Sequence, residues 1–267
     1  MVTNAPVRSA IGVLYEDDRC LVVDKPPRLL VHRGPCNDRD TLVARVRRYL
    51  GCRTVHPIHR LDRQTSGVVL FAKDAEAART LRRAFDARAV EKLYVAIVRG
   101  VAPPFADVEH ALRPGRDGAA VPAWTLVRTL AVADVEPFPV SVVACQPLTG
   151  RTHQIRRHMA HLRRPVLMDA NYGNSRQNRA FRARHGLARL GLHARLLAFP
   201  SPTQAQERVE AVADLAPDLR RVLASLGLSE GVVEAELSRA RAEFAAHLRF
   251  RTCPKVQAPR RDGRPWA

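Results

Sequence analysis

The amino-acid sequence predicts an α+β protein, and three features support that class. The chain of 267 residues is 46% hydrophobic, which is long and apolar enough to bury the core of one large domain. Short runs rich in β-branched and aromatic residues indicate strands, whereas amphipathic stretches with capping residues indicate helices. Neither an internal repeat nor a low-complexity tract interrupts this pattern.

The first 90 residues are expected to form a β-hairpin followed by two helices. The strands of the hairpin are predicted at residues 11–15 and 20–24, and the helices at residues 41–50 and 75–88. Asp40 and Asp74 are the expected N-caps, and Gly51 is placed to end the first helix. Residues 1–10 are expected to be a disordered lead.

The sequence predicts further strands, one of them between these two helices, and further helices. The strands are expected at residues 68–72, 93–98, 123–130, 140–145 and 192–199, and the helices at residues 151–161, 214–226 and 229–248. Near its end the chain changes character, with an amphipathic helix followed by a basic, proline-containing tail. We therefore predict a main domain over residues 1–215 and a helical, basic C-terminal extension over residues 216–267.

The charge of the chain indicates a polyanionic partner. The net charge is +18, and 40 of the 44 basic residues are arginine, which pairs with phosphate through two hydrogen bonds and stacks on bases. Arginine-rich composition also follows from genome base composition, so charge alone does not prove such a partner. Residues 151–195 contain eleven arginines and one acidic residue, and they are the expected phosphate-contacting wall.

Several classes of compartment and site are disfavoured by the sequence. Five cysteines without a Cys-x-x-Cys pair indicate free thiols, and no signal peptide or membrane span is seen, so we expect a cytoplasmic protein. Metal ligands could be drawn in two groups, but neither has His-Glu-x-x-His or paired Cys-x-x-Cys, and neighbouring arginines would repel a dication. We expect no metal and no cofactor. The two groups are His153, His158 and His161, and Cys52, His56 and His59.

The most informative stretch is His59-Arg60-Leu61-Asp62-Arg63-Gln64-Thr65-Ser66-Gly67. An extended segment precedes it and a buried strand follows it, which places Asp62 on a turn between strands. Arg60 and Arg63 are the expected charged neighbours of Asp62, and nearby opposite charge keeps a carboxylate ionised and available as a nucleophile or base. A structural Arg/Asp turn is the alternative that the spacing leaves open.

Together with three later blocks, this stretch resembles the RluA family of RNA pseudouridine synthases. The blocks are Lys92-Leu93-Tyr94-Val95-Ala96-Ile97-Val98-x-Gly100, Thr149-Gly150-Arg151-Thr152-His153-Gln154-Ile155-Arg156-x-His158 and Leu192-His193-Ala194. The resemblance implies that the main domain is a pseudouridine synthase catalytic domain, with a long, mixed, mostly antiparallel central sheet, flanking helices and a central cleft. It also implies isomerisation of uridine to pseudouridine in structured RNA without a cofactor.

The same resemblance implies roles for individual residues. Asp62 matches the catalytic aspartate, which would attack the uracil or the ribose or remove a sugar proton. Tyr94 is expected to stack on the uracil and to handle the proton lost from C5. Arg156 is expected to pair with Asp62, and Arg60 to fill the place of the extruded base. The RNA-binding candidates are Arg60, Arg63, Arg151, His153, Arg163, Arg164, Arg176 and Arg179.

Three further blocks are similar to the TruC-type branch of the family, which modifies a uridine in the acceptor-stem region of tRNA. They are His158-Met159-Ala160-His161-Leu162, Arg176-Gln177-Asn178-Arg179 and His185-Gly186-Leu187-x-Arg189-Leu190-x-Leu192-His193-Ala194. A loop at residues 171–190 that clamps the stem is the expected basis for this choice, and a loop that only packs on the core is the alternative. We therefore expect a monomer that binds tRNA rather than rRNA. An rRNA pseudouridine synthase and a non-catalytic RNA-binding protein on the same fold are the rival functions. Met168 departs from the family, which usually has glycine before the aspartate, here Asp169.

Overall fold

The structure, a computed structural model, describes residues 11–33, 38–115, 118–204 and 206–250. Its strands are β1 (Gly12–Glu16), β2 (Cys20–Lys25), β3 (His56–Pro57), β4 (Ser66–Ala72), β5 (Glu91–Arg99), β6 (Phe105–Glu109), β7 (Trp124–Ala133), β8 (Val140–Pro147), β9 (Leu192–Pro200) and β10 (Arg208–Val212). Its helices are α1 (Leu42–Leu50), α2 (Ala75–Asp86), α3 (Gln154–His161), α4 (Ser175–His185), α5 (Pro217–Ser225) and α6 (Glu230–Phe250).

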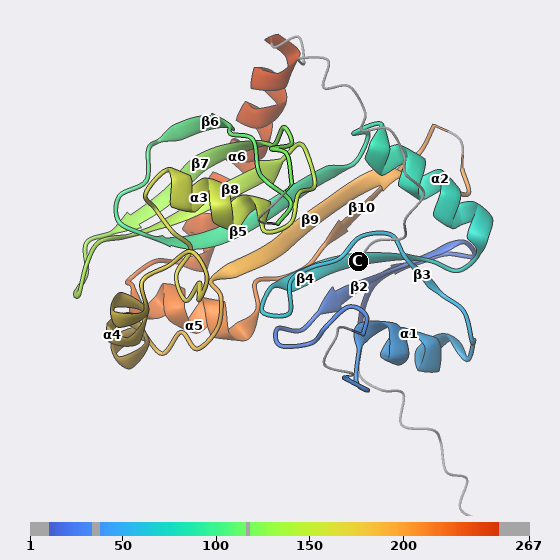
Figure 1. The fold of residues 1–267 in the computed structure, drawn as a ribbon, viewed down its shortest axis with the longest axis horizontal. Coiled ribbons are helices and arrows are strands. Elements are labelled where there is room, and N and C mark those ends of the chain that lie inside the picture. The colour runs from blue at the N-terminus through green and yellow to red at the C-terminus, as the bar shows by residue number, and fades with distance from the viewer. Residues whose placement is uncertain (1–10, 34–37, 116–117, 205, 251–267) are drawn as a thin grey trace, which may run out of the picture.

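One sheet crosses the whole described part of the molecule (Figure 1). Its strands follow the order β1-β2-β4-β9-β5-β8-β7-β6, with β3 paired to β4 and β10 paired to β9. The pairs are antiparallel except for β4 with β9, which run parallel. The predicted α+β class, with a long, mixed, mostly antiparallel sheet, is therefore confirmed.

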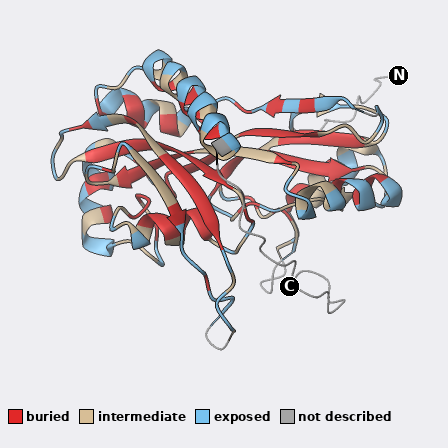
Figure 2. Cartoon of the chain, turned by 90° about the horizontal axis from the view of Figure 1, so that it is seen from above, coloured by how far each residue is buried: buried red, intermediate tan, exposed pale blue. Residues whose placement is uncertain are grey.

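Alternate residues of the central strands pack against different helices. Val142 and Ala144 of β8 belong to the cluster that contains residues of α5 and α6, whereas Val143 and Cys145 belong to the cluster that contains residues of α3. Because neighbouring residues of a strand point to opposite faces, α3 and α6 lie on opposite sides of β8. Figure 2 shows the resulting pattern, with buried residues along the strands and exposed residues along the outer faces of the helices.

The helix caps agree with the sequence prediction at one helix and differ at the other. Asp74 caps α2 by accepting hydrogen bonds from the N–H groups of Glu76 and Ala77, as predicted. The predicted cap of α1 is wrong by one position, because Thr41 is the residue in extended conformation whose hydroxyl accepts from the N–H of Ala44. Asp40 instead forms an ion pair with Arg45.

Three elements were not predicted, namely β6, β10 and α4. Helix α4 occupies the segment expected to be a loop, and it gives no amphipathic signal because only Asn178 and Phe181 among its residues are buried. Helix α3 starts at Gln154 rather than at 151, because His153 has a left-handed backbone with φ 54°.

Helices α5 and α6 pack directly on the sheet. The residues that do so share a core cluster with Val95 and Val142, and they are Leu219, Val222, Leu223, Val233, Leu237, Ala240 and Phe244. The division of the chain at residue 215 stays a prediction. The expected lead over residues 1–10 and the basic tail beyond residue 250 lie outside the described residues.

The packing of α6 predicts that Phe244→Ala lowers the free energy of unfolding by about 3 to 5 kcal/mol, because Phe244 is fully buried beside Phe105. Urea unfolding followed by circular dichroism measures this change. Val232→Ala on the same helix is the control, since Val232 is 54% exposed, and its effect should stay below about 0.5 kcal/mol. Two unfolding transitions, of which Phe244→Ala shifts only one, would show that α6 folds independently.

Candidate active site

The loop that carries Asp62 joins β3 to β4 and is held against β9. Gly67 has φ 109°, and a Cβ atom there would lie 2.1 Å from the carbonyl oxygen of Ala194, so only glycine fits. Beside it, the Ser66 hydroxyl hydrogen-bonds Nδ1 of His193 over 2.8 Å. Burial lowers the pKa of His193 to about 4, so this histidine is neutral near pH 7 and serves as an anchor. The Leu192-His193-Ala194 motif contains this histidine, but the sequence alone predicts no role for it.

A buried lysine of β2 also holds the backbone of this loop. Lys25 is fully buried, and its ammonium donates hydrogen bonds to the carbonyl oxygens of Pro26, Leu29 and Arg63. Burial, and then the charge of Arg189, lower the pKa of Lys25 to about 7, although Asp62 opposes this shift. The backbone next to Asp62 is therefore fixed from two sides, by β9 and by Lys25.

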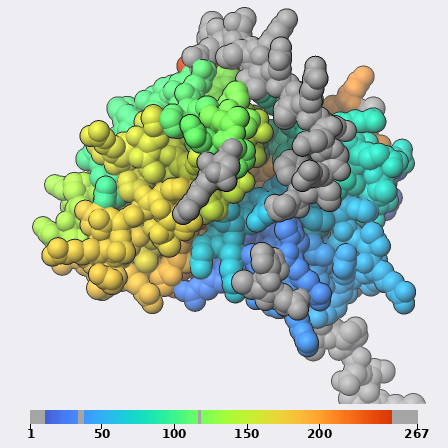
Figure 3. Space-filling model, viewed as in Figure 1, coloured from blue at the N-terminus to red at the C-terminus, as the bar shows by residue number. Residues whose placement is uncertain are grey.

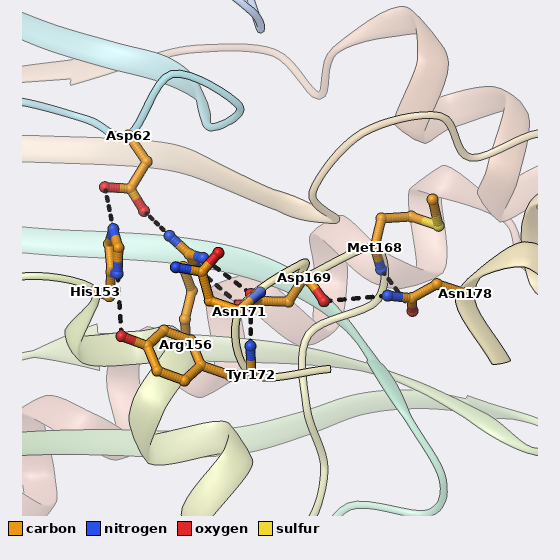
Figure 4. A network of polar contacts seen from close by, with 8 residues as sticks. All are labelled: Asp62, His153, Arg156, Met168, Asp169, Asn171, Tyr172 and Asn178. Carbon is orange, nitrogen blue, oxygen red and sulfur yellow. Dashed lines mark hydrogen bonds and ion pairs between the residues drawn. The ribbon is translucent and has the colours of Figure 1, made fainter. Parts of the chain in front are cut away.

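Asp62 is the exposed end of a chain of three charges (Figure 4). Arg156 of α3 donates from Nη1 to Oδ2 of Asp62 over 2.9 Å. Its other edge binds Asp169 twice, from Nε over 2.7 Å and from Nη2 over 2.9 Å. Side-chain exposure falls along this chain, from 26% for Asp62 to 9% for Arg156 and 0% for Asp169. The expected pairing of Arg156 with Asp62 is present.

Both residues in the buried part of this chain of charges, Asp169 and Arg156, are ionised. Burial acts to raise the pKa of Asp169, but Arg156 and the N–H groups of Asn171 and Tyr172 outweigh it and hold that pKa below its ordinary value. Burial likewise opposes the charge of Arg156, yet the hydrogen bonds that it donates to Asp169 and Asp62 raise its pKa. An arginine flanked by two carboxylates leaves the group with a net negative charge, and Asp62 carries its solvent-facing end.

A second contact reaches Asp62 through His153. Nε2 of His153 lies 3.6 Å from Oδ1 of Asp62, and its Nδ1 hydrogen-bonds the Tyr172 hydroxyl over 3.1 Å. The Tyr172 ring also lies under the guanidinium of Arg156, with 5.2 Å between the guanidinium carbon and the ring centroid. Burial, ahead of the opposing charge of Asp62, lowers the pKa of His153. Tyr172 was not predicted as a site residue, because only the fold brings it to Arg156.

Tyr94 faces this site from β5. Ala194 of β9 pairs with Gly67 on one side and with Tyr94 on the other, so β9 places the Asp62 loop and Tyr94 next to one another. Burial, and then the charge of Asp62, raise the pKa of Tyr94, so its phenol is protonated near pH 7. Tyr94 therefore presents an aromatic ring and an O–H group.

The predicted charged neighbours of Asp62 behave differently from the expectation. Arg60 is exposed, and Arg63 points to Asp38 at 3.6 Å and to the carbonyl oxygen of Arg28. Within the described residues, neither of these expected charged neighbours forms an ion pair with Asp62. On a tight turn neighbouring side chains diverge, and the partner of Asp62 comes instead from α3.

The other arginines among the RNA-binding candidates differ in their contacts with the rest of the protein. Arg151 and Arg164 donate to the carbonyl oxygens of Pro122 and Val101, which commits part of each guanidinium to the fold. Arg163, Arg176 and Arg179 are exposed. In the space-filling view, the part of the chain around residues 150–190 and the first 70 residues meet on one face (Figure 3).

Within the described residues no helix is long and apolar enough to cross a membrane, and no three His, Cys, Asp or Glu side chains could hold a metal ion.

Comparison with known proteins agrees with this arrangement. A model of the family described as RNA pseudouridylate synthase matches residues 19–161. Proteins named tRNA pseudouridine synthase C are similar to this chain in Haemophilus ducreyi, at 40% identity over 215 residues (74% of this chain, 88% of the relative), and in Pasteurella multocida, at 39% over 216 residues (74% and 88%). The solved structure of human RNA Pseudouridylate Synthase Domain Containing 1 matches with a TM-score of 0.68 and 28% identity, covering 88% of this chain and 97% of that chain.

The sheet, the arginine-held aspartate and these matches define an RNA-modifying isomerase. The chain belongs to the RNA pseudouridylate synthase family, of the RluA type that its motifs resemble. Its reaction is the isomerisation of uridine to pseudouridine in RNA.

The buried Arg156–Asp169 pair predicts a pH-dependent effect of Asp169→Asn on stability. Because the pKa of Asp169 is lowered in the folded state, its contribution is complete above the ordinary aspartate value and is lost as the pH falls below about 4. The substitution should cost about 3 kcal/mol of unfolding free energy near pH 7 and progressively less below pH of about 4. Urea unfolding over this pH range measures it, with Asp214→Asn as an exposed control. A cost that stayed constant would contradict the prediction.

Proposed function

We propose that this enzyme modifies a uridine in tRNA and that Asp62 is its catalytic carboxylate. The observation that carries the assignment of Asp62 is the Asp62–Arg156–Asp169 chain, in which a buried, doubly bound arginine presents one partly exposed carboxylate. The tRNA substrate is supported by the names of the relatives in Haemophilus ducreyi and Pasteurella multocida. Free Cys20, Cys52 and Cys145 support the cytoplasm as the compartment, and we propose a monomer.

The reaction exchanges a bond from C1′ to N1 of uracil for a bond from C1′ to C5. The base must leave its stack to reach Asp62, and the exposed Arg60 is the candidate to fill the vacated place. One oxygen of Asp62 accepts from Arg156, while among the described residues the other has only the longer contact to His153 and is therefore available to the substrate. That oxygen either attacks the uracil or the ribose or takes a sugar proton.

Asp169 keeps Arg156 from neutralising Asp62 completely. If Arg156 had no second partner, its whole charge would act on Asp62 and weaken it as a nucleophile or base. With Asp169 bound to the other edge, Arg156 orients Asp62 while the group retains net negative charge.

Tyr94 supplies a ring for the base and a path for a proton. A protonated phenol stacks on uracil without bringing a second negative charge near Asp62. When C5 forms its bond to C1′ it must lose a proton. The Tyr94 hydroxyl can receive that proton only as it passes its own proton onward, and N1 of the product requires one.

Asp62→Asn should lower kcat for pseudouridine formation by at least about 10³-fold, because the amide has the same shape but lacks the negative charge. RNA affinity should stay within about 3-fold, since phosphate contacts dominate binding. Tritium release from C5-labelled RNA gives the rate, and filter binding gives the Kd. Turnover close to that of the wild type would remove Asp62 from the mechanism.

Purified enzyme incubated with bulk tRNA and, separately, with rRNA transcripts should form pseudouridine in the tRNA. The physical reason is that a helix end offers shape and backbone rather than readable base edges, and the exposed arginines of α4 can contact that backbone. Because uridine and pseudouridine have the same mass, liquid chromatography of the nucleosides from complete digests, compared with untreated RNA, measures the product. Pseudouridine confined to rRNA would overturn the choice of tRNA and leave the reaction class unchanged.

Arg176→Gln with Arg179→Gln should reduce the slope of log affinity against log salt by about 1.4 to 1.8, which corresponds to two lost phosphate contacts. Both residues are exposed on α4. Arg239→Gln is the control, because Arg239 is 72% exposed and lies on α6 rather than on α4. An unchanged slope in the double variant, or an equal change in the control, would place the RNA elsewhere.

A further inference from the structure

The turn that carries Asp169 contains a residue in a disfavoured backbone conformation. Met168 has φ 63°, in the left-handed region where a Cβ atom crowds the following carbonyl group and glycine is preferred. The next residue, Asp169, is fully buried and provides both oxygens that bind the far edge of Arg156. The direction in which Asp169 points therefore depends on the conformation of Met168.

One side chain from α4 holds this turn on both sides. The Asn178 amide accepts from the N–H of Met168 through Oδ1 over 3.1 Å, and donates from Nδ2 to the carbonyl oxygen of Asp169 over 3.1 Å (Figure 4). Asn178 is 9% exposed, so water competes little for these bonds. A carboxamide carries an acceptor and a donor on two separate atoms at the end of the side chain, which lets it bond both groups of the turn. Gly173 closes the same space, since a Cβ atom there would lie 2.5 Å from the Asp169 carbonyl oxygen and 3.2 Å from Nδ2 of Asn178.

We propose that Asn178 is a positioning residue for the reaction. Its carboxamide holds Met168 in the left-handed conformation, which aims Asp169 at Arg156 and thereby fixes the direction in which Arg156 presents its Nη1 to Asp62. Asn178 acts through these residues from α4, at the buried end of the chain of charges. The inference rests on the proposed role of Asp62.

The proposal is tested with Asn178→Ala alone and in combination with Met168→Gly. Without the clamp the turn relaxes, so kcat should fall by about 10-fold to 100-fold while KM and the RNA Kd stay within about 2-fold. Glycine adopts a φ of 63° without strain and no longer needs the clamp, so the double variant should recover most of the lost kcat. Wild-type kcat in Asn178→Ala, or a double variant no faster than Asn178→Ala, would overturn the proposal.

Asn174→Ala is the matched control, because Asn174 is the same residue type and its side chain caps the same helix by accepting from the N–H of Gln177 rather than from the turn of Asp169. It should lower Tm and leave kcat unchanged. If it lowered kcat as much as Asn178→Ala, helix stability rather than the clamp would set the activity, and the proposal would fail. Should Asn178→Ala not fold, Asn178→Asp with and without Met168→Gly makes the same test, because it retains the acceptor and removes the donor.

Asp62→Asn, assayed on the same RNA, distinguishes a failure of the proposed role of Asp62 from a failure of the proposed role of Asn178. An active Asp62→Asn enzyme would defeat the proposed role of Asp62, whatever Asn178 does. An inactive Asp62→Asn enzyme together with a fully active Asn178→Ala enzyme would defeat only the clamp.

Discussion

The ion pair between Arg156 and Asp169 is the interaction on which the geometry of the site depends. Placing two charges inside a protein is costly, and their attraction offsets that cost only when the geometry is good and the remaining hydrogen-bonding atoms are satisfied. Both conditions hold here, because Asp169 binds two nitrogens of Arg156 and also accepts from the N–H groups of Asn171 and Tyr172. A guanidinium held in this way has little freedom, and Asp62 meets a fixed partner.

The sheet brings the remaining parts to that partner. The short parallel contact between β4 and β9 lets the chain leave the Asp62 loop directly beside the strand that also pairs with Tyr94. Glycine at position 67 is what permits the approach, since any side chain would meet the backbone of Ala194. The helices then hold the arrangement from both faces of the sheet, with α3 on one and α6 on the other.

Local patterns predicted most of the strands and the residues of the central motifs, because alternation and capping depend on near neighbours in sequence. They did not identify the partner of Asp62, which was predicted only through the resemblance to a family. Charge proximity in the sequence pointed instead to Arg60 and Arg63, whereas the partner, Arg156, lies 94 residues away. Helix α4 was missed because Phe181 is its only buried apolar residue, and a single apolar residue makes no periodic pattern. The catalytic and RNA-binding roles remain proposals.

Helix α4 has two faces with different surroundings, since Arg176 and Arg179 are exposed to solvent while Asn178 is buried against the turn of Asp169. A phosphate backbone bound to the outer face would act on the same helix, α4, that holds the turn of Asp169 and thereby sets the direction of Arg156. Part of the free energy of RNA binding could then be spent on aligning the carboxylate rather than on tighter association. In that case a short RNA that fails to reach α4 would be a slow substrate even at saturating concentration.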